Sequence, residues 1–414
     1  MNNVEIWLWL LLVMHPCNNK LPRLLEQYQT AEEAARAVRD GKCGFLSDAE
    51  KQRAKTVRSR EVRQLMEECS ANGIRIITLD DEEYPDALRQ IVDPPIVLFV
   101  RGTLEGLRDE IVITVIGSRR PSEYSLDITG RICGELAKLG TVIVSGLAVG
   151  IDSAAHRCAV NCGSRTIGVL ACGMLVNYPS ENEQLKLDIV KQGGAIISEL
   201  LPHTRVSPSY FQHRNRILSG LSLGTLIIEA STRSGCLLTA EHTIQQGRDL
   251  FCVPPHDITL EQYAGVMNLL RDGAIPVFSY IDIINEYLYN YCHAIDMDKA
   301  LSGLSTLDRV RSRGSSKGER EEKKSFRKKS TDPPEESAEE KVEKNSAQPD
   351  ESVYGTLDPN AAKILRHIVE KPLTMDEIMS LTEMSHIDAS TALADLEIFG
   401  HITRRADGRY SLPE

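Results

Sequence analysis

The sequence predicts an α/β protein in which a parallel sheet is covered by helices on both faces. Short, almost continuously apolar segments recur between residues 74 and 253, and helix-length segments separate several of them. Strands of this kind are typical of parallel sheets that are buried on both faces. The flanking patterns add an N-terminal helical domain and a C-terminal winged helix to this fold class.

Length and composition limit the classes of protein. The chain has 414 residues, too many for one ordinary domain, and 42% of them are hydrophobic. The net charge of −11 argues against a uniformly basic nucleic-acid binder, but it leaves room for a local basic groove because salt screens charges beyond about 8 Å. The ten cysteines form no C-x-x-C pair, so we expect free thiols in a reducing cytoplasm, with no disulfides and no metal site.

An apolar run extends from Ile6 to Met14 near the start of the chain. Glu5 precedes it, no basic segment leads into it, and it is shorter than the roughly 20 residues that span a membrane. We therefore expect a buried first helix, a cytoplasmic location and no membrane partner.

Residues 1–72 predict a small helical domain. We favour packing or partner contact as its role; the alternative is a helix-hairpin-helix-like contact with nucleic-acid backbone, although no Gly-x-Gly hairpin signal is present. The expected helices are Val4–Met14, Leu21–Tyr28 and Ala31–Arg39, followed by a charged stretch from Ser47 to Asn72.

Residues 73–293 alternate strands with helices and predict the central domain. Expected helices include 127–139, 183–192 and 239–246. The expected strands are 74–79, 96–100, 111–116, 142–144, 166–170, 195–198, 225–228 and 250–253.

Residues 294–352 are first basic, from Arg309 to Lys329, and then acidic, from Asp332 to Glu343. Few apolar residues are present, so we expect a disordered tether; added nonspecific nucleic-acid affinity is the alternative.

Residues 353–414 predict three helices and a hairpin, which together make a winged helix. The first helix is expected at residues 361–370, and the second begins after a capping box at Thr374. The third is expected from Ser385 to Gly400. The third helix has no Lys or Arg between residues 386 and 399 and carries three acidic residues. DNA reading by that helix would be electrostatically unfavourable, so we favour a protein-contact role, with any DNA contact limited to the arginines of the hairpin.

Small and polar residues follow nearly every strand of the central domain. Ligands of open parallel sheets bind outside the carboxyl ends of the strands, and glycines, hydroxyls and N–H groups suit a phosphate. The residues that we expect at such a site are Gly117, Ser118, Arg119 and Ser122 after one strand, Ser145 and Gly146 after the next, and Ser234 and Gly235 after a later one.

The stretch from Thr141 to His156 is the most suggestive of these turns. A buried strand, a glycine turn and a helix start place free backbone N–H groups at one point, which predicts an anion site. It is neither a Walker loop nor the three-glycine dinucleotide fingerprint. The alternative is that the glycines only permit a tight bend.

A second group is formed by Phe211, Arg214, Asn215 and Arg216, directly before an apolar helix at Ile217. An aromatic ring beside two arginines suits a single strand of nucleic acid, whose bases stack and whose phosphates pair with arginine. The alternative places Phe211 in the core and pairs Arg214 with Glu199 or Glu229.

Residue patterns for catalysis are sparse. The sequence has no recognisable Ser/His/Asp grouping, no H-E-x-x-H motif and no carboxylate cluster for a metal. We expect His156 to be a packed histidine and no cofactor to be bound. Glu229 is the one residue with an alternative role, as a general acid or base in a nucleotide-cleaving site.

The central domain resembles the DNA-processing protein A family, also called DprA or Smf. The motifs that carry the resemblance follow one another in the family's order. They are GSR-x-x-S at Gly117–Ser122, SGLAVGID-x-A-A-H at Ser145–His156, YP-x-x-N at Tyr178–Asn182, SE at Ser198-Glu199, RNRILSGLS at Arg214–Ser222, EA-x-x-x-SG-x-LLTA at Glu229–Ala240 and G-x-x-N-x-L-x-x-GA at Gly265–Ala274.

The resemblance implies a Rossmann-like domain that binds single-stranded DNA without catalysis. Proteins of this family dimerise, protect incoming strands in natural transformation, and load the RecA recombinase onto DNA that is coated by single-strand-binding protein. By motif match, Arg119, the Ser145-Gly146 turn and the segment Arg214–Arg216 would line the DNA pocket.

Three positions depart from the family pattern. Gln212 stands where a proline is common, Ser207 stands near the place of a basic residue for which Arg205 is the nearest substitute, and Leu175 replaces an aspartate. These departures predict a weaker or differently shaped strand site. The alternative function is a Rossmann-like enzyme that binds or cleaves nucleotides, for which Gly224-Thr225 and Glu229 loosely resemble the required arrangement.

Overall fold

The computed structural model describes residues 2–294 and, in the C-terminal part, residues 359–382, 384, 389, 392–393, 396, 402–405 and 409–412. The chain forms two compact units, residues 1–323 and 324–414, which we describe separately. The predicted tether, apart from residue 294, lies outside the described residues.

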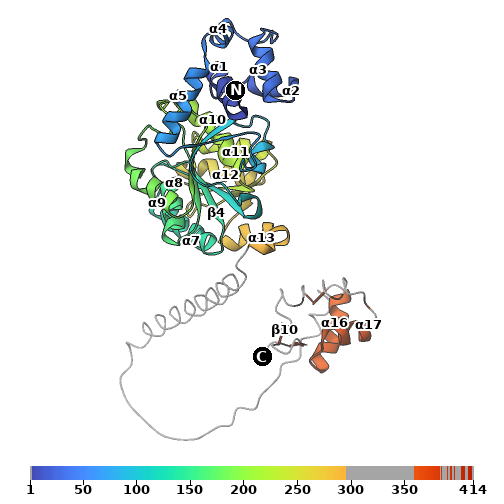
Figure 1. Ribbon diagram of the computed structural model, residues 1–414. Helices are drawn as coiled ribbons and strands as arrows, with labels where there is room; N and C mark the ends of the chain where they lie inside the picture. The colour runs from blue at the N-terminus through green and yellow to red at the C-terminus, as the bar shows by residue number, and fades with distance from the viewer. Residues whose placement is uncertain are drawn as a thin grey trace, which may run out of the picture. The chain divides into compact units, whose positions relative to one another are not determined.

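Five helices open the first unit (Figure 1). The apolar run lies in the first of them, where Trp7, Leu8 and Leu10 are buried, and these side chains share one hydrophobic cluster with Phe99 and Ile196 of the sheet. The core of the N-terminal helices is therefore continuous with the apolar side chains on this part of the sheet. Within the described ranges no helix is long and apolar enough to span a bilayer. The helices are α1 (Asn3–Met14), α2 (Leu21–Gln27), α3 (Ala31–Arg39), α4 (Asp48–Thr56) and α5 (Ser59–Ala71).

A nine-stranded sheet follows, in the order β1-β2-β6-β5-β4-β3-β7-β8-β9. All eight predicted strands are present within two residues of their expected bounds, and β9 was not predicted because it is only two residues long and contains Pro276. The strands are β1 (Arg75–Thr78), β2 (Val97–Gly102), β3 (Val112–Ile116), β4 (Val142–Ser145), β5 (Thr166–Val169), β6 (Ala195–Ser198), β7 (Gly224–Ile227), β8 (Asp249–Cys252) and β9 (Ile275–Pro276).

The predicted parallel sheet is confirmed over most of its width, and one edge is antiparallel, so the sheet as a whole is mixed. The strands from β3 to β9 pair in parallel, whereas β1 pairs antiparallel with β2, and β2 pairs antiparallel with β6. A parallel neighbour needs a crossover, usually through a helix. The connection between β1 and β2 holds only the four-residue helix α6 (Asp86–Arg89), so the chain returns beside itself at this edge.

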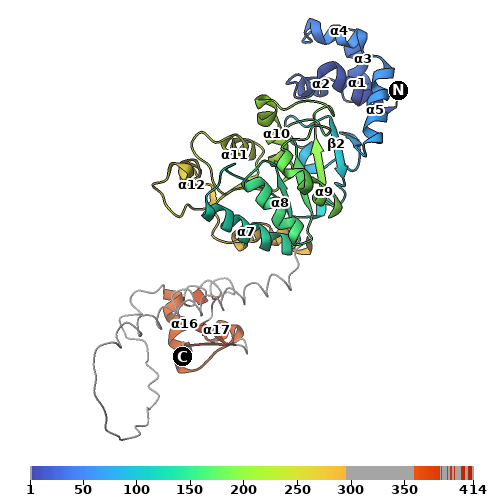
Figure 2. The same cartoon turned by 90° about the vertical axis from the view of Figure 1, so that its left-hand side faces the viewer.

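Helices cover both faces of the sheet, as expected (Figures 1 and 2). On one face α6 packs with α10 (Pro208–Leu221), α11 (Cys236–Gln245) and α12 (Ala264–Arg271) in one hydrophobic cluster. On the other face α7 (Glu123–Lys138), α8 (Ile151–Asn161) and α13 (Tyr280–Tyr291) share a second cluster, and α9 (Glu183–Lys191) packs beside α8.

The strand order reverses at β3. From β3 the sheet grows outward through β4, β5 and β6, and the chain then returns to place β7 on the other side of β3. The loops that leave β3 and β7 consequently run to opposite faces of the sheet. Such a topological switch point leaves a crevice at the carboxyl ends of the strands.

The described part of the second unit agrees with the predicted winged helix. Helices α16 (Pro359–Glu370) and α17 (Met375–Thr382) precede a hairpin of β10 (Thr403–Arg404) and β11 (Tyr410–Ser411). The predicted capping box forms, because Glu377 N donates to Thr374 Oγ1 and Thr374 N donates to Glu377 Oε2. Most of the predicted third helix, residues 385–400, lies outside the described residues, as do residues 406–408 between the two strands of the hairpin.

Candidate functional site

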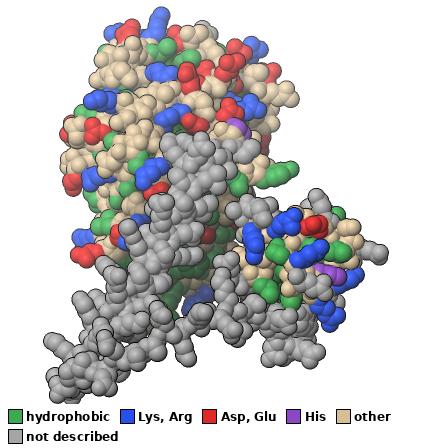
Figure 3. Space-filling view, turned by 90° about the horizontal axis from the view of Figure 1, so that it is seen from below, with side chains coloured by type: hydrophobic (Ala, Val, Ile, Leu, Met, Phe, Trp, Pro, Cys, Tyr) green, Lys and Arg blue, Asp and Glu red, His purple; other side chains and the backbone are tan. Residues whose placement is uncertain are grey.

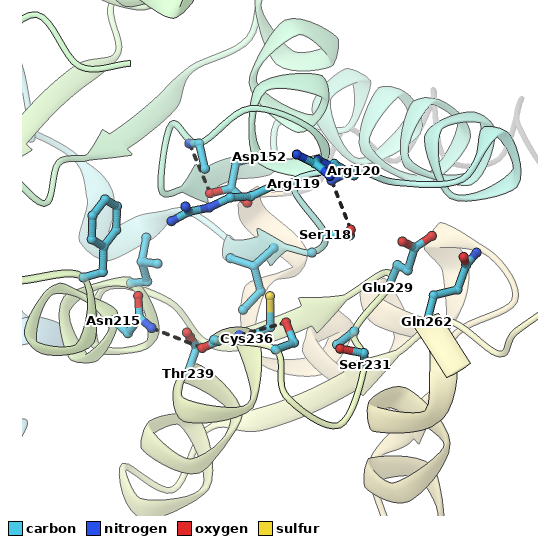
Figure 4. A pocket seen from close by; sticks show the side chains of 18 of the residues that line it. Ser118, Arg119, Arg120, Asp152, Asn215, Glu229, Ser231, Cys236, Thr239 and Gln262 are labelled. Carbon is cyan, nitrogen blue, oxygen red and sulfur yellow. Dashed lines mark hydrogen bonds between the residues drawn. The ribbon is translucent and has the colours of Figure 1, made fainter. Parts of the chain in front are cut away.

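A hollow of about 360 Å³ opens at the switch point (Figure 4). The loops after β3 and β7 form two of its walls, α10 forms a third, and Asp152 of α8 lies at its base. The predicted site residues that line it are Gly117, Ser118, Arg119, Phe211, Arg214, Asn215, Ser234 and Gly235. The structure thus brings together side chains from three separate stretches of sequence.

Arg119 is an exposed cation of the hollow, as is its neighbour Arg120. Its guanidinium carbon lies 5.0 Å from the centre of the Phe211 ring, and that of Arg214 lies 5.9 Å from the same ring. Phe211 is only partly buried, so it is neither a plain core residue nor a free aromatic surface. An arginine held against an aromatic ring is ordered without losing its charge.

The helix α10 explains which of its side chains reach the hollow. Phe211, Arg214, Asn215 and Leu218 are spaced by three, four and seven residues and therefore share one helical face, which lines the hollow. Arg216 is two positions from Arg214 and points to the opposite side. There, with Gln212 and His213, it lines a different hollow.

Arg214 forms the floor of the site. The residue is 5% exposed, and its Nη1 donates to the carbonyls of Gly146, at 2.8 Å, and Val169. Its Nε is buried without a hydrogen-bond partner among the described residues. Burial lowers the pKa of Arg214 from its ordinary value, while the nearby Asp152 carboxylate opposes this shift. Neither Glu199 nor Glu229, the carboxylates of the alternative interpretation, is a hydrogen-bond partner of Arg214 in the described part of the chain.

The turn after β4 is occupied by the protein's own carboxylate. Asp152 accepts hydrogen bonds from Gly146 N at 3.2 Å and from Ala148 N at 3.4 Å, and Ile151 N donates to Ser118 O at 3.2 Å. Burial raises the pKa of Asp152, and Arg214 opposes this shift. The sequence predicted free N–H groups at this turn, but those of Gly146, Ala148 and Ile151 are already bonded within the protein.

Ser145 and Gly146 lie behind the lining of the hollow. Ser145 Oγ donates to Val115 O at 2.6 Å inside the sheet. A side chain at Gly146 would collide with the Arg214 guanidinium, since its Cβ would lie 2.4 Å from Nη1. These residues shape the floor, and Gly146 leaves the space that Arg214 fills.

Ser122 and Glu229 form a polar cluster at one side of the hollow. Glu229 Oε2 accepts hydrogen bonds from Ser122 N at 3.0 Å, Ser122 Oγ at 2.9 Å and Ser125 Oγ at 2.7 Å. Ser122 also caps α7, because its Oγ accepts from Ser125 N at 3.1 Å. Ser122 is not among the lining residues, whereas Glu229 lines the hollow beside Gln262 (Figure 4).

Replacing Ser122 with alanine removes this cap and one donor to Glu229. We expect the Ser122→Ala variant to lose about 1–2 kcal/mol of unfolding free energy, as measured by urea denaturation. The control is Ser70→Ala on the exposed face of α5, for which we expect a change within about 0.5 kcal/mol. Equal stabilities of the two variants would mean that Ser122 does not hold α7 in place.

Arg216 lies outside the hollow and forms a buried ion-pair network. Its two terminal nitrogens donate to Glu199 at 2.8 and 2.7 Å, and its Nε donates to Asp93 Oδ2 at 3.1 Å. The thiol of Cys17 donates to the same Glu199 at 3.3 Å. Burial alone would raise the pKa of Glu199, but the Arg216 guanidinium outweighs it and the pKa lies below its ordinary value. Arg216 therefore ties α10 to β6 and to the N-terminal segment.

Polar lining residues outside the predicted set include Arg120, Ser231, Thr239 and Gln262. Arg120 and Ser231 stand in the strand-end loops and could have been found there. Thr239 and Gln262 belong to α11 and to the turn before α12, so a search of strand ends does not reach them.

Two wider observations limit the chemistry of this unit. In the described part of the chain nine cysteines are free, and no group of His, Cys, Asp or Glu could hold a metal ion. On the face of the first unit that Figure 3 shows, basic and acidic side chains are intermixed.

Comparison with known proteins identifies similar sequences and a similar structure. A family model described as DNA recombination-mediator protein A matches residues 75–288, and one described as DprA winged helix domain matches residues 346–408. The DNA processing protein DprA of Bacillus subtilis is 38% identical over 215 residues, covering 52% of this chain and 71% of that protein.

Two further relatives cover more of the chain. The protein Smf of Synechocystis is 31% identical over 358 residues, which cover 84% of this chain and 82% of that protein. The crystal structure of DNA processing protein A from Streptococcus pneumoniae superposes with a TM-score of 0.61 at 29% identity, covering 69% of this chain and 98% of that one.

Proposed function

The chain belongs to the DNA processing protein A (DprA/Smf) family, and on this premise we propose that the hollow at the switch point binds single-stranded DNA. The observation that carries the proposal is the contact between Arg119 and Phe211 at the hollow. The ring holds the guanidinium of Arg119 in place at the hollow, and an ordered, exposed cation of this kind suits the phosphates of a single strand.

The charges of the hollow support an anionic ligand of modest size. Three arginines, Arg119, Arg120 and Arg214, face two carboxylates, Asp152 and Glu229. The volume of about 360 Å³ is of the size that holds a small part of one strand. The departure at Gln212 does not alter this lining, because Gln212 lies on the opposite side of α10.

We propose the finer function on the strength of family membership. The chain would act as a homodimer in the cytoplasm, protect incoming DNA during natural transformation, and load the RecA recombinase onto strands coated by single-strand-binding protein in homologous recombination. The Gly117–Ser118–Arg119 loop, Phe211, Arg214, Asn215 and the Ser234-Gly235 turn would form the DNA site. Arg216, Ser122, Ser145 and Gly146 would support it from behind.

A titration tests the binding proposal directly. We expect a fluorescent dT20 strand to bind more tightly than a duplex of the same length at two salt concentrations. The logarithm of its binding constant should fall with the logarithm of salt concentration by about 0.7 for each neutralised phosphate. Equal affinity for strand and duplex would contradict a site built for a single strand.

A truncated chain tests which of the two units provides the main contacts with DNA. A chain ending at residue 300 retains the described part of the first unit, and we expect it to bind dT20 within about threefold of the full chain, because each hollow residue is present. A loss of more than about tenfold would assign the main contacts to the second unit or to the predicted tether.

The alternative, a nucleotide-cleaving enzyme, rests on Glu229 in the hollow. Its Oε2 already accepts three hydrogen bonds from Ser122 and Ser125, so that oxygen is committed to the fold. We therefore propose binding without catalysis. Incubation with nucleoside monophosphates tests this: release of free base that Glu229→Gln abolishes would establish the enzyme instead.

A further inference from the structure

A second groove of about 320 Å³ adjoins the hollow. Its lining comprises Arg119, Tyr178, Val206, Ser207, Pro208 and Phe211. Arg119 and Phe211 line both spaces and so form the wall between them. A strand that lies against Arg119 in the hollow has this groove as its immediate continuation.

The groove is mainly apolar and contains an aromatic pair. The rings of Tyr178 and Phe211 lie 6.0 Å apart, inclined at 73°. Val206 is 41% exposed, and the Pro208 ring is also accessible. An apolar space bounded by aromatic and aliphatic side chains suits a flat nucleobase better than a phosphate.

The Arg119 guanidinium restricts where a base can stack. It lies over the Phe211 ring at 5.0 Å, and a base that stacked on that face would have to displace it. Tyr178 has no such cation in the contacts of the described residues. The ring that remains available beside the Arg119 charge is therefore that of Tyr178.

We propose that this groove is a nucleobase subsite, in which one base of the strand packs against Tyr178, Val206 and Pro208. The phosphate of the same nucleotide contacts Arg119, and the neighbouring nucleotide continues into the hollow. The subsite rests on the proposed strand binding and adds a second contact point to it. It is sequence-tolerant, because every base presents an apolar face.

Three protein variants and two probes test the subsite in the full chain. The probes are dT20 and a 20-residue abasic strand with the same phosphates and no bases. Tyr178→Ala should weaken dT20 binding about five- to hundredfold and leave the abasic strand unchanged. Tyr178→Phe should retain the wild-type affinity, since it keeps the ring. The control Tyr289→Ala removes a tyrosine that is 94% exposed on α13 and should change neither affinity.

Photo-crosslinking gives a readout that does not depend on a variant. We expect wild-type protein that is irradiated with dT20 containing 5-iodouracil to carry an adduct on Tyr178, identified by mass spectrometry. An adduct confined to other residues, together with unchanged affinity of Tyr178→Ala, overturns the subsite.

The same measurements distinguish failure of the proposed strand binding from failure of the proposed subsite. If wild-type protein binds neither dT20 nor the abasic strand, strand binding itself is wrong and the subsite falls with it. If Arg119→Ala weakens both probes while Tyr178→Ala weakens neither, strand binding stands and the subsite is wrong. Weakening of dT20 and the abasic strand alike by Tyr178→Ala also overturns it, because the loss would then not involve a base.

Discussion

The Arg119→Ala variant should bind dT20 about ten- to hundredfold more weakly than the wild type. Arg119 is the exposed cation at the wall between the hollow and the adjoining groove, so its removal deletes a charge-assisted contact with phosphate. The slope of the logarithm of the binding constant against the logarithm of salt concentration should also decrease by about 0.7, because one fewer phosphate is neutralised.

Two control variants show whether the effect of Arg119→Ala is specific to the hollow and whether it depends on the charge of Arg119 or on its planar group. Arg131→Ala removes an exposed arginine of α7 that pairs with Asp127 at 2.9 Å, and it should leave the affinity within about twofold. Arg119→Lys keeps the charge but not the planar group that lies on Phe211, so its affinity should fall between those of the wild type and the alanine variant. If Arg119→Ala behaves like Arg131→Ala, the hollow is not the strand site.

The sheet could be predicted from the sequence because its strands are buried on both faces and leave a strong apolar signal. The antiparallel edge could not, since β1 and β2 contain short apolar runs like those of the parallel strands. Their direction depends on how the connection between them runs, and the sequence of that connection contains no signal for its path. The two-residue β9 is defined only by its pairing with β8.

The sequence predicted most of the residues that line the hollow, but it did not predict that only one arginine of the RNR motif would be among them. The two arginines of the RNR motif were expected to work together, but on a helix residues two positions apart face opposite sides. The predicted helix began at Ile217, whereas α10 begins at Pro208 and contains both arginines. Had the helix been extended to Pro208, its periodicity alone would have separated Arg214 from Arg216.

The phosphate cradle predicted after β4 shows a different limit of sequence analysis. A glycine turn before a helix offers the same N–H groups to an external phosphate and to an internal carboxylate. Asp152 lies in the first turn of α8, and its hydrogen bonds to Gly146 and Ala148 depend on the folded turn. The stretch is therefore a rigid support for Arg214, and the exposed cation is supplied by the loop after β3.

The Gly150→Ala variant should lose about 2–6 kcal/mol of unfolding free energy in urea denaturation. Gly150 has φ of +88° and ψ of −131°, a conformation that costs other residues about 1–3 kcal/mol. An added Cβ would also lie 2.4 Å from Ser118 O and 2.9 Å from the Arg119 backbone, and such overpacking costs about 1–3 kcal/mol more.

Gly163 at the other end of α8 gives the control for this substitution. Its φ is +70°, but nothing lies within 4 Å of an added Cβ, so Gly163→Ala should cost only about 1–2 kcal/mol. The difference between the two variants measures the contact between the turn and the Arg119 loop. Because that contact sets the position of Arg119, Gly150→Ala should also weaken dT20 binding whereas Gly163→Ala should not. Equal effects of the two variants on stability and affinity would contradict this prediction. The turn at Gly150 would then not position the loop that carries Arg119.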